Sequence, residues 1–451
     1  MKDFDAVIIG FGKGGKTLAG YLAKQGKKVA IIEKDKNMYG GTCINVGCIP
    51  SKALVTSSRY AKVNPTWAFS KKTAYYDVSI QEKNEITSFL RDKNYHKLAD
   101  NSNIEVFDGI GSFVSKNEVK VVSKEKEEIL HSELIFINTG SRPYLPKIKG
   151  IENNPHVFIS ETMLNVTRLP RKLTIIGAGY ISMEFASMYA NFGTKVTVLQ
   201  DGPTFLPKED RDVALAIKAN LEKQGVRIIP SALISEITNK TVYYTVNGKH
   251  STVTGEDILL ATGRRPNIQE LDLEKAGIEL TERGAIKVNE HLETNVKGIF
   301  ALGDVNGGPQ FTFVSLDDFR IVRDYLENKN QGHTLLTRQA IPYSVFMDTP
   351  LARVGLSEDQ AKAKNIPYVV KKIMTNTIPK ARVLRETNGF LKALVDPETK
   401  QILGAALLCA ESYEIINTIS LAMSLKVPYT YLADFIYTHP TMSESFNDLF
   451  A

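Results

Sequence analysis

The sequence predicts an α/β protein with two strand–helix–strand units and a separate α+β domain towards the C-terminal end. Residues 5–10 form a continuous apolar run, which is followed by a glycine-rich turn, a helical stretch and a second apolar run at residues 28–32. This order is typical of a parallel strand buried on both faces, its crossover helix and the next strand. Because the same arrangement returns at residues 173–199, we expect two such units.

The first glycine-rich turn has the spacing of a phosphate-binding loop. Gly10, Gly12 and Gly15 form a GxGxxG pattern. The first glycine permits a tight turn, the second lets the backbone approach a pyrophosphate, and the third lets the helix pack on the strand. Glu33 follows the second apolar run, where a carboxylate can accept hydrogen bonds from ribose hydroxyls. These features predict a Rossmann-like dinucleotide-binding domain rather than a purely structural turn.

The second glycine-rich turn differs from the first at two positions. Gly177 and Gly179 repeat the first two glycines, but Ser182 replaces the third, and Gln200 stands where the first unit has Glu33. Gln200 carries no charge that would repel the 2′-phosphate of NADPH, yet no arginine adjoins it to bind that phosphate. NADH and NADPH therefore both remain open. The nearby cations whose direction the sequence does not give are Lys195, Lys208 and Arg211.

The C-terminal part of the chain has a different pattern. Strand-like runs at residues 390–395 and 401–408 precede a helical stretch at 411–425, which predicts a domain of its own. Cys409 follows the second run and is interpreted as a small core residue. Earlier in the chain, the polar, helix-patterned residues 57–100 are a candidate border of a substrate entrance.

Composition and charge exclude several classes of protein. The 451 residues are 43% hydrophobic and 24% charged, with a net charge of +6, which is typical of a globular protein with several domains. The basic residues form no arm or tail, which argues against nucleic-acid binding. No apolar run reaches the roughly 20 residues of a membrane span, and we see no signal-peptide pattern. With only three cysteines, we exclude a disulfide scaffold and expect a reducing, cytoplasmic location.

Two cysteines five positions apart carry the expected chemistry. Cys43 and Cys48 lie in the run GGTCINVGCIPSK at residues 40–52. The thiolate is the nucleophilic form of cysteine, and a nearby positive charge or helix N-terminus favours it. Lys52 follows Cys48 by one helical turn, so both side chains can lie on one face. We interpret the pair as a redox-active disulfide rather than as two unpaired core cysteines.

These motifs resemble those of the pyridine-nucleotide disulfide oxidoreductases, the class I flavoprotein disulfide reductases, over essentially the whole chain. The most specific motifs are the cysteine run at residues 40–48 and the segment His439-Pro440-Thr441-Met442-Ser443-Glu444. Residues 294–304 are similar to the second flavin motif of the family, and residues 261–266 to the hinge after its nicotinamide domain. The resemblance implies FAD as cofactor and NADPH or NADH as electron donor; we expect no metal site.

The same resemblance implies a domain order and an assembly. It places a FAD-binding domain at residues 1–149, continued at 266–338, and a NAD(P)-binding domain at 150–265. A C-terminal dimerisation domain at 339–451 would make the protein a homodimer. The cofactor-binding residues that the resemblance adds to those above are Thr42, Lys52, Thr139, Gly140, Gly263, Gly303 and Asp304.

The resemblance also gives the catalytic candidates their roles. Cys43 is the outer thiol, which meets the substrate, and Cys48 is the inner thiol, which contacts the flavin. Lys52 pairs with Glu184 close to the flavin and tunes hydride transfer.

His439 and Glu444 form the acid–base pair. A histidine titrates near neutral pH, and a carboxylate partner orients its ring and stabilises its charged form. In the family these two residues come from the other subunit and approach the outer thiol, so a single chain would lack a complete site.

Within the family, the chain is similar to the bacterial reactive-chlorine-resistance flavoproteins, which reduce hypothiocyanous acid. We therefore expect the Cys43 thiolate to attack the sulfur of this small oxidant, His439 to manage the proton of the leaving hydroxide, and Cys48 to displace thiocyanate. The stretches that carry this likeness are residues 38–45, 311–320, 342–347 and 443–450.

Other functions remain open on the sequence alone. The same cysteines could reduce mercuric or cupric ions, although mercuric reductases usually carry a second cysteine pair near the C-terminus that this sequence does not show. The active-site motif also fits a disulfide reductase of the glutathione reductase or lipoamide dehydrogenase type. A non-enzymatic flavin redox sensor is a further alternative, and the presence of an acid–base pair argues against it.

Overall fold

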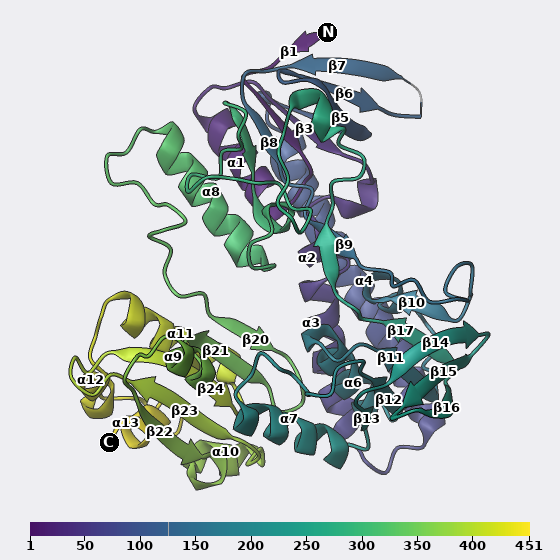
Figure 1. Cartoon of the computed structure of the whole chain (residues 1–451), viewed down its shortest axis with the longest axis vertical. Helices are drawn as coiled ribbons and strands as arrows, with labels where there is room; N and C mark the ends of the chain where they lie inside the picture. Colours follow the sequence, from purple (N-terminus) through teal and green to yellow (C-terminus); the bar gives the residue numbers. More distant parts are fainter. Residues whose placement is uncertain (125) are drawn as a thin grey trace.

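The first nucleotide-binding domain is built on a five-stranded parallel sheet (Figure 1). The computed structural model describes residues 1–124 and 126–451. In spatial order, the strands are β19 (Ile299–Ala301), β8 (Ile135–Ile137), β2 (Ala6–Ile9), β3 (Val29–Glu33) and β4 (Ile104–Asp108). Because β19 pairs with β8, a segment that follows the second domain in sequence completes this sheet. The helices of the domain are α1 (Lys13–Lys24), η1 (Lys36–Met38), η2 (Leu273–Ala276), η3 (Gly303–Asn306) and α8 (Thr312–Leu326).

A smaller four-stranded sheet covers the outer end of this domain, near the N-terminus (Figure 1). Its core side chains, among them Phe113, Val119 and Leu130, are buried against those of the large sheet. In spatial order, its strands are β1 (Lys2–Asp3), β7 (Glu127–His131), β6 (Glu118–Val122) and β5 (Ile110–Ser115).

The second nucleotide-binding domain repeats the parallel architecture. Two short strands, β9 (Ser141–Pro143) and β18 (Arg264–Pro266), pair where the chain enters and leaves it. The sheet has the order β10 (Val157–Ile159), β17 (Asp257–Leu260), β11 (Lys172–Ile176), β12 (Lys195–Leu199), β13 (Arg227–Ile229). The remaining elements are α5 (Ser160–Met163), α6 (Tyr180–Asn191), α7 (Arg211–Lys223) and the antiparallel β14 (Leu233–Thr238), β15 (Thr241–Val246) and β16 (Lys249–Thr254).

The C-terminal domain is an antiparallel five-stranded sheet with helices, in agreement with the predicted α+β pattern. Cys409 is completely buried in its core, and burial raises the pKa of this thiol. The strand order is β20 (Tyr343–Val345), β21 (Leu351–Gly355), β24 (Ile402–Leu408), β23 (Phe390–Val395), β22 (Val369–Met374). The helices are α9 (Glu358–Ala363), η4 (Thr375–Thr377), α10 (Pro379–Leu384), α11 (Ser412–Ser424), α12 (Tyr429–Asp434) and α13 (Ser445–Phe450).

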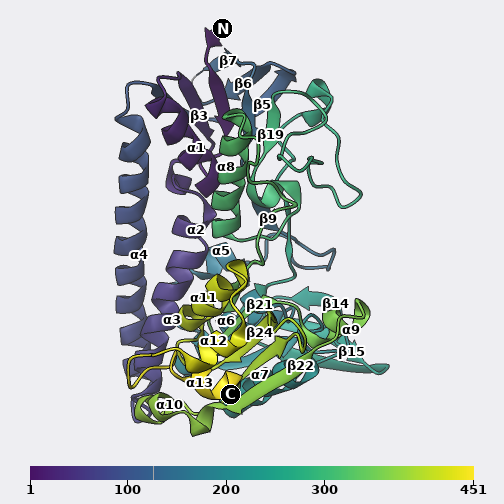
Figure 2. The same ribbon diagram turned by 90° about the vertical axis from the view of Figure 1, so that its left-hand side faces the viewer.

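The segment between β3 and β4 also contains the short α2 (Thr42–Asn45), α3 (Cys48–Lys62) and the long α4 (Phe69–Ala99), and side chains of α3 and α4 pack with those of the second domain. Figure 2 shows α4 along one side of the molecule, from the first domain to the second. Its contacts with the second domain include a hydrogen bond from the Tyr76 hydroxyl to Val166 O. In the described part of the chain, no helix has both the length and the apolar character needed to cross a membrane.

Candidate active site

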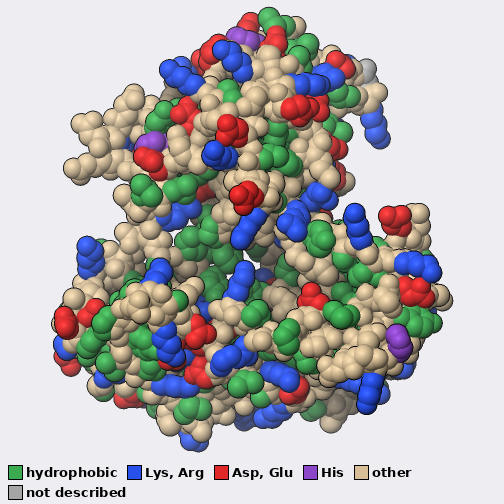
Figure 3. All heavy atoms as spheres, in the orientation of Figure 1, with side chains coloured by type: hydrophobic (Ala, Val, Ile, Leu, Met, Phe, Trp, Pro, Cys, Tyr) green, Lys and Arg blue, Asp and Glu red, His purple; other side chains and the backbone are tan. Residues whose placement is uncertain are grey.

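A continuous cleft of about 3070 Å³ runs between the two nucleotide-binding domains and reaches the C-terminal domain. Both glycine-rich turns and both cysteines of the 40–52 run line it. Figure 3 shows a hollow at the centre of the molecule, with lysine and arginine side chains around it. This charge suits anionic ligands such as dinucleotides.

The turn after β2 fits a dinucleotide. Gly10 has a φ of 102°, a conformation that favours glycine, and a Cβ on Gly12 would lie only 2.4 Å from Asn138 Oδ1. Glu33 lies at the end of β3 and lines the cleft. Its Oε2 accepts a hydrogen bond of 3.1 Å from the Phe11 N–H. Burial raises the pKa of Glu33 to about 6, although backbone hydrogen bonds oppose the shift.

The third glycine of this turn has the predicted packing role. Gly15 is buried and does not line the cleft. A Cβ at this position would lie 2.9 Å from Ile8 Cγ2 on β2, so glycine allows α1 to pack closely on the sheet.

The turn after β11 has a similar form. Gly177 has a φ of 100°. At Gly179, a Cβ would meet no atom within 4 Å, and the residue faces the cleft. This glycine therefore leaves open space for a second dinucleotide. Ser182, which replaces the third glycine, is completely buried in α6.

The structure turns Gln200 away from the cleft, contrary to its expected place among the cofactor-binding residues. Its Nε2 donates hydrogen bonds to Gly202 O at 2.9 Å and Thr204 O at 2.7 Å. These bonds hold the amide inside its own loop, so the cleft is lined instead by Asp201 and Lys208.

The two cysteines lie at the starts of helices, as expected. Cys43 is in α2 and Cys48 is the first residue of α3, and both are free thiols. Cys48 Sγ lies 3.8 Å from the Thr312 Oγ1 at the N-terminus of α8. Interaction with Cys48 lowers the pKa of Cys43 against the effect of burial, helped by Thr312, Lys16 and Lys52. The same interaction raises the pKa of Cys48, and the charge of Lys52 opposes this shift. The site therefore favours a thiolate on Cys43 and a thiol on Cys48.

Lys52 and Glu184 form the expected ion pair. Lys52 Nζ lies 2.7 Å from Glu184 Oε2, and Glu184 Oε1 accepts a hydrogen bond of 2.9 Å from the Phe346 N–H. The Phe346 ring lies beneath the ammonium, 4.8 Å from ring centre to Nζ, and stacks on Tyr413. Three domains thus meet at one charged pair beside the cysteines.

His439 and Glu444 pair with each other, but within one chain they do not line the cleft. His439 Nδ1 is 2.7 Å from Glu444 Oε2. The His439 side chain is 72% exposed, whereas that of Glu444 is 17% exposed. The imidazole is therefore oriented by its carboxylate and presented outward from the C-terminal domain.

Asp304 lies in η3 at the cleft wall. Its Oδ2 accepts a hydrogen bond of 2.6 Å from the Ser141 hydroxyl, which in turn accepts one of 2.8 Å from Arg264 Nε. Burial raises the pKa of Asp304, while Ser141 and Arg264 oppose this shift. Gly303 lies behind Asp304, and its N–H donates to Asp318 Oδ2, so Gly303 supports the wall without lining it.

The cleft brings most of the predicted residues together. Of the predicted set, the residues that line it are Gly10, Gly12, Glu33, Thr42, Cys43, Cys48, Lys52, Thr139, Gly140, Gly177, Gly179, Glu184, Gly263 and Asp304. Sequence reasoning missed Thr312, Ser141 and Lys16. The position of Lys16, directly after the GxGxxG pattern, was the available signal for that residue.

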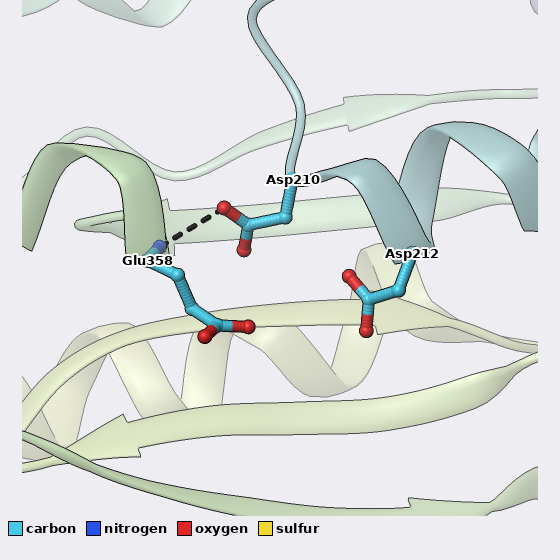
Figure 4. A group of neighbouring side chains, drawn as sticks. All are labelled: Asp210, Asp212 and Glu358. Carbon is cyan, nitrogen blue, oxygen red and sulfur yellow. Dashed lines mark hydrogen bonds between the residues drawn. The ribbon is translucent and has the colours of Figure 1, made fainter. Parts of the chain in front are cut away.

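Three carboxylates outside the cleft, those of Asp210, Asp212 and Glu358, have oxygens within 4.8 Å of one another. This spacing is close enough for the three groups to surround one cation. Figure 4 shows them approaching each other from the second and C-terminal domains. The buried ammonium of Lys392 on β23 fills this role, at 2.8 Å from Asp210, 2.7 Å from Asp212 and 3.0 Å from Glu358. The cluster is therefore an ion-pair clamp between the two domains.

The comparisons with known proteins identify the class. Residues 4–318 match the pyridine nucleotide-disulphide oxidoreductase family, and residues 341–450 match its dimerisation domain. The chain belongs to this family of flavoprotein disulfide reductases, enzymes that act on sulfur-containing acceptors and use FAD and NADH or NADPH.

Individual relatives are similar to this chain over almost its full length. The probable pyridine nucleotide-disulfide oxidoreductase RclA of Escherichia coli is 47% identical over 100% of this chain and 99% of its own. A solved structure, the Cu(II) complex of HOCl-induced flavoprotein disulfide reductase RclA from Escherichia coli, has a TM-score of 0.93 at 46% identity, covering 100% and 99% of the two chains. Dihydrolipoyl dehydrogenase of Geobacillus stearothermophilus is 33% identical over 98% of this chain and 94% of its own.

Proposed function

We propose that this enzyme reduces hypothiocyanous acid to thiocyanate with electrons from NADH or NADPH, as a defence against reactive chlorine species. The observation that carries the proposal is the thiol pair at the cleft, where both cysteines lie at helix starts and the surroundings lower the pKa of Cys43 and raise that of Cys48. A thiolate available at neutral pH attacks a small electrophilic sulfur compound without further activation. Similarity to a flavoprotein described as HOCl-induced supports the defensive role.

The cleft fits the cofactors of the family. The first glycine turn, Glu33 and Asp304 would hold FAD, and Gly140, with a φ of 71°, leaves space where a Cβ would project. The second glycine turn, with Asp201 and Lys208, would hold the nicotinamide nucleotide. Bound FAD would supply hydride transfer from the nucleotide to the disulfide.

The residues of the chain account for the sulfur chemistry. The Cys43 thiolate attacks the sulfur of HOSCN, the S–O bond breaks, and the leaving hydroxide takes a proton from protonated His439 to become water. Cys48 then loses its proton and attacks the Cys43 sulfur, so that thiocyanate leaves and a Cys43–Cys48 disulfide forms. The thiols lose two electrons and the oxidant gains them.

The proton donor would come from the partner subunit. His439 and Glu444 are already paired and oriented outward, on the domain that matches the dimerisation domain of the family. A homodimer would thereby complete each cleft with the partner's acid–base pair.

The first test is oxidation of NADH and NADPH at 340 nm, dependent on hypothiocyanous acid, with Cys43→Ser as the control. We expect turnover that the substitution abolishes. Rapid flavin reduction by the nucleotide without turnover on this oxidant would refute the proposed acceptor.

Mixed dimers test the shared site. A dimer of one Cys43→Ser chain and one His439→Gln chain has one intact site if Cys43 and His439 meet across the interface, and none if they meet within a chain. We expect about half of the parental activity. Activity no higher than that of the two single-variant homodimers would refute sharing.

Reduction of Cu(II) is the second candidate. It is favoured by the structural similarity to RclA, whose Cu(II) complexes include one of the C43S mutant. Copper-dependent NADH oxidation that survives Cys43→Ser, while hypothiocyanous acid reduction is lost, would separate the two activities.

A further inference from the structure

Lys16 is a partly buried cation beside the cysteine loop. It lies in the first turn of α1, and its Nζ donates hydrogen bonds to Gly40 O at 3.1 Å and Asn94 Oδ1 at 2.6 Å. Gly40 precedes Cys43 by three residues. Within residues 1–124 and 126–451, no carboxylate oxygen lies within the 4.0 Å ion-pair distance of this ammonium, whereas Lys52 has Glu184.

One face of α4 fixes the loop that Lys16 contacts. Arg91 Nε donates to Asn45 Oδ1 at 3.1 Å, and Tyr95 stacks on Tyr39 with ring centres 4.6 Å apart. The cysteine loop is thus held between α1 and α4. This contact gives the helical stretch at residues 57–100 a role in the site itself.

The charges around Lys16 and Cys43 determine how strongly the ammonium and the thiol influence each other's ionisation. Burial lowers the pKa of Lys16 to about 8, Lys13 and Lys97 lower it further, and Cys43 opposes them. The ammonium form therefore prevails at neutral pH. Cys48 and Lys52, both on α3, are further titratable groups that lower the pKa of Cys43.

We propose that Lys16 is a positioning residue for Cys43. Held by Gly40 and Asn94 and left without a carboxylate partner among the described residues, its ammonium stabilises the negatively charged form of the Cys43 sulfur. The inference deepens the proposed function, because it rests on Cys43 being the attacking sulfur. It does not depend on which oxidant the enzyme meets.

The test measures the ionisation of Cys43 directly. The FAD-loaded Cys48→Ser protein is reduced, and the rate of iodoacetamide alkylation at Cys43, located by mass spectrometry, is followed from pH 5 to 10. In this background Lys16→Met should raise the midpoint pH by about one unit, since a nearby opposite charge shifts a pKa by 1–3 units. Alkylation below the midpoint should slow about tenfold. Lys16→Arg should retain the parental midpoint.

A second variant separates charge from structure. Asn94→Asp keeps a hydrogen-bond acceptor for Lys16 but adds a negative charge that offsets the charge of the ammonium. This variant should therefore also raise the midpoint pH for alkylation of Cys43. Lys24→Met, an exposed lysine on the last turn of the same helix, is the matched control and should leave it unchanged.

Two results would overturn the inference. The first is a Lys16→Met midpoint equal to that of the Lys24→Met control. The second is an unchanged midpoint in Asn94→Asp, because any effect of Lys16→Met would then come from lost structure rather than lost charge. Neither result bears on the acceptor, since no oxidant is used.

Discussion

The clamp around Lys392 should control how firmly the C-terminal domain is joined to the second domain. Lys392 is completely buried and bonds to Asp210, Asp212 and Glu358. Burial alone would lower its pKa, but these carboxylates outweigh that effect and raise it. Lys392→Met keeps the apolar length of the side chain and removes the charge, leaving three crowded carboxylates without their shared cation.

The expected loss is about 3–5 kcal/mol of unfolding free energy near pH 8, the range for removing one partner of a buried ion pair. In the parent protein, burial of Asp212 is outweighed by hydrogen bonds from Lys372 and Lys392, which lower its pKa. Its contribution is thus present above the unfolded pKa of about 3.9 and lost as the pH falls through the folded value. In Lys392→Met, mutual repulsion should raise the folded pKa values above the unfolded ones. These carboxylates then destabilise the variant as the pH rises. The loss of unfolding free energy in Lys392→Met, relative to the parent, should therefore be smaller at pH 5 than at pH 8.

Urea unfolding of the FAD-loaded protein at pH 5 and pH 8, followed by circular dichroism, measures both effects. Lys372→Met is the matched control, because Lys372 pairs with Lys392 across β22 and β23 and contacts Asp212 at 2.6 Å from an exposed position. An exposed pair contributes at most about 1 kcal/mol. If Lys392→Met lost no more stability than the control, or lost more at pH 5 than at pH 8, the reasoning would be refuted.

Three further predictions concern the cleft. Thr312→Val should raise the pH midpoint for Cys43 alkylation in the reduced, otherwise unchanged enzyme, because the hydroxyl contributes to the low pKa of Cys43; Thr312→Ser should retain the parental value. Binding of FAD to the apoprotein, followed by fluorescence quenching, should weaken as the pH falls through about 6, where Glu33 becomes protonated, and a Glu33→Gln protein should lack this dependence. Glu184→Ala should destabilise the protein to urea by about 1.5–3 kcal/mol, since the Phe346 N–H loses a charged acceptor; Glu184→Gln should recover part of this, and equal losses in both would contradict the assignment.

Local signals account for the parts of the fold that the sequence predicted. Strand β23 has the predicted bounds at residues 390–395, and α11 lies within one residue of the predicted stretch at each end. Each of these elements has a short hydrophobic pattern that ends at turn-forming or helix-breaking residues, so its position depends little on distant residues. The glycine turns could be predicted for the same reason.

Contacts between distant segments account for what the sequence could not give. Gln200 has the expected place after β12, but the course of the next four residues decides where its amide points. The Lys392 clamp joins residues from three separate stretches of the chain, and no spacing rule connects them. Lys16 lies 27 positions before Cys43, and its bonds to Gly40 and to Asn94 of α4 depend on how three separate segments pack.

The arrangement of cations around the cysteines supports the proposal that Cys43, rather than Cys48, is the attacking sulfur. Lys52 shares its charge with Glu184, whereas the charge of Lys16 is not offset by a carboxylate among the residues that the structure describes. The unshared cation therefore favours the sulfur of the loop it contacts. The interaction with Cys43 raises the pKa of Cys48, which favours the thiol form of Cys48. After the oxidant has reacted, the thiolate on Cys43 is consumed, and Lys52, whose charge lowers the pKa of Cys48, then favours ionisation of that thiol for the second step.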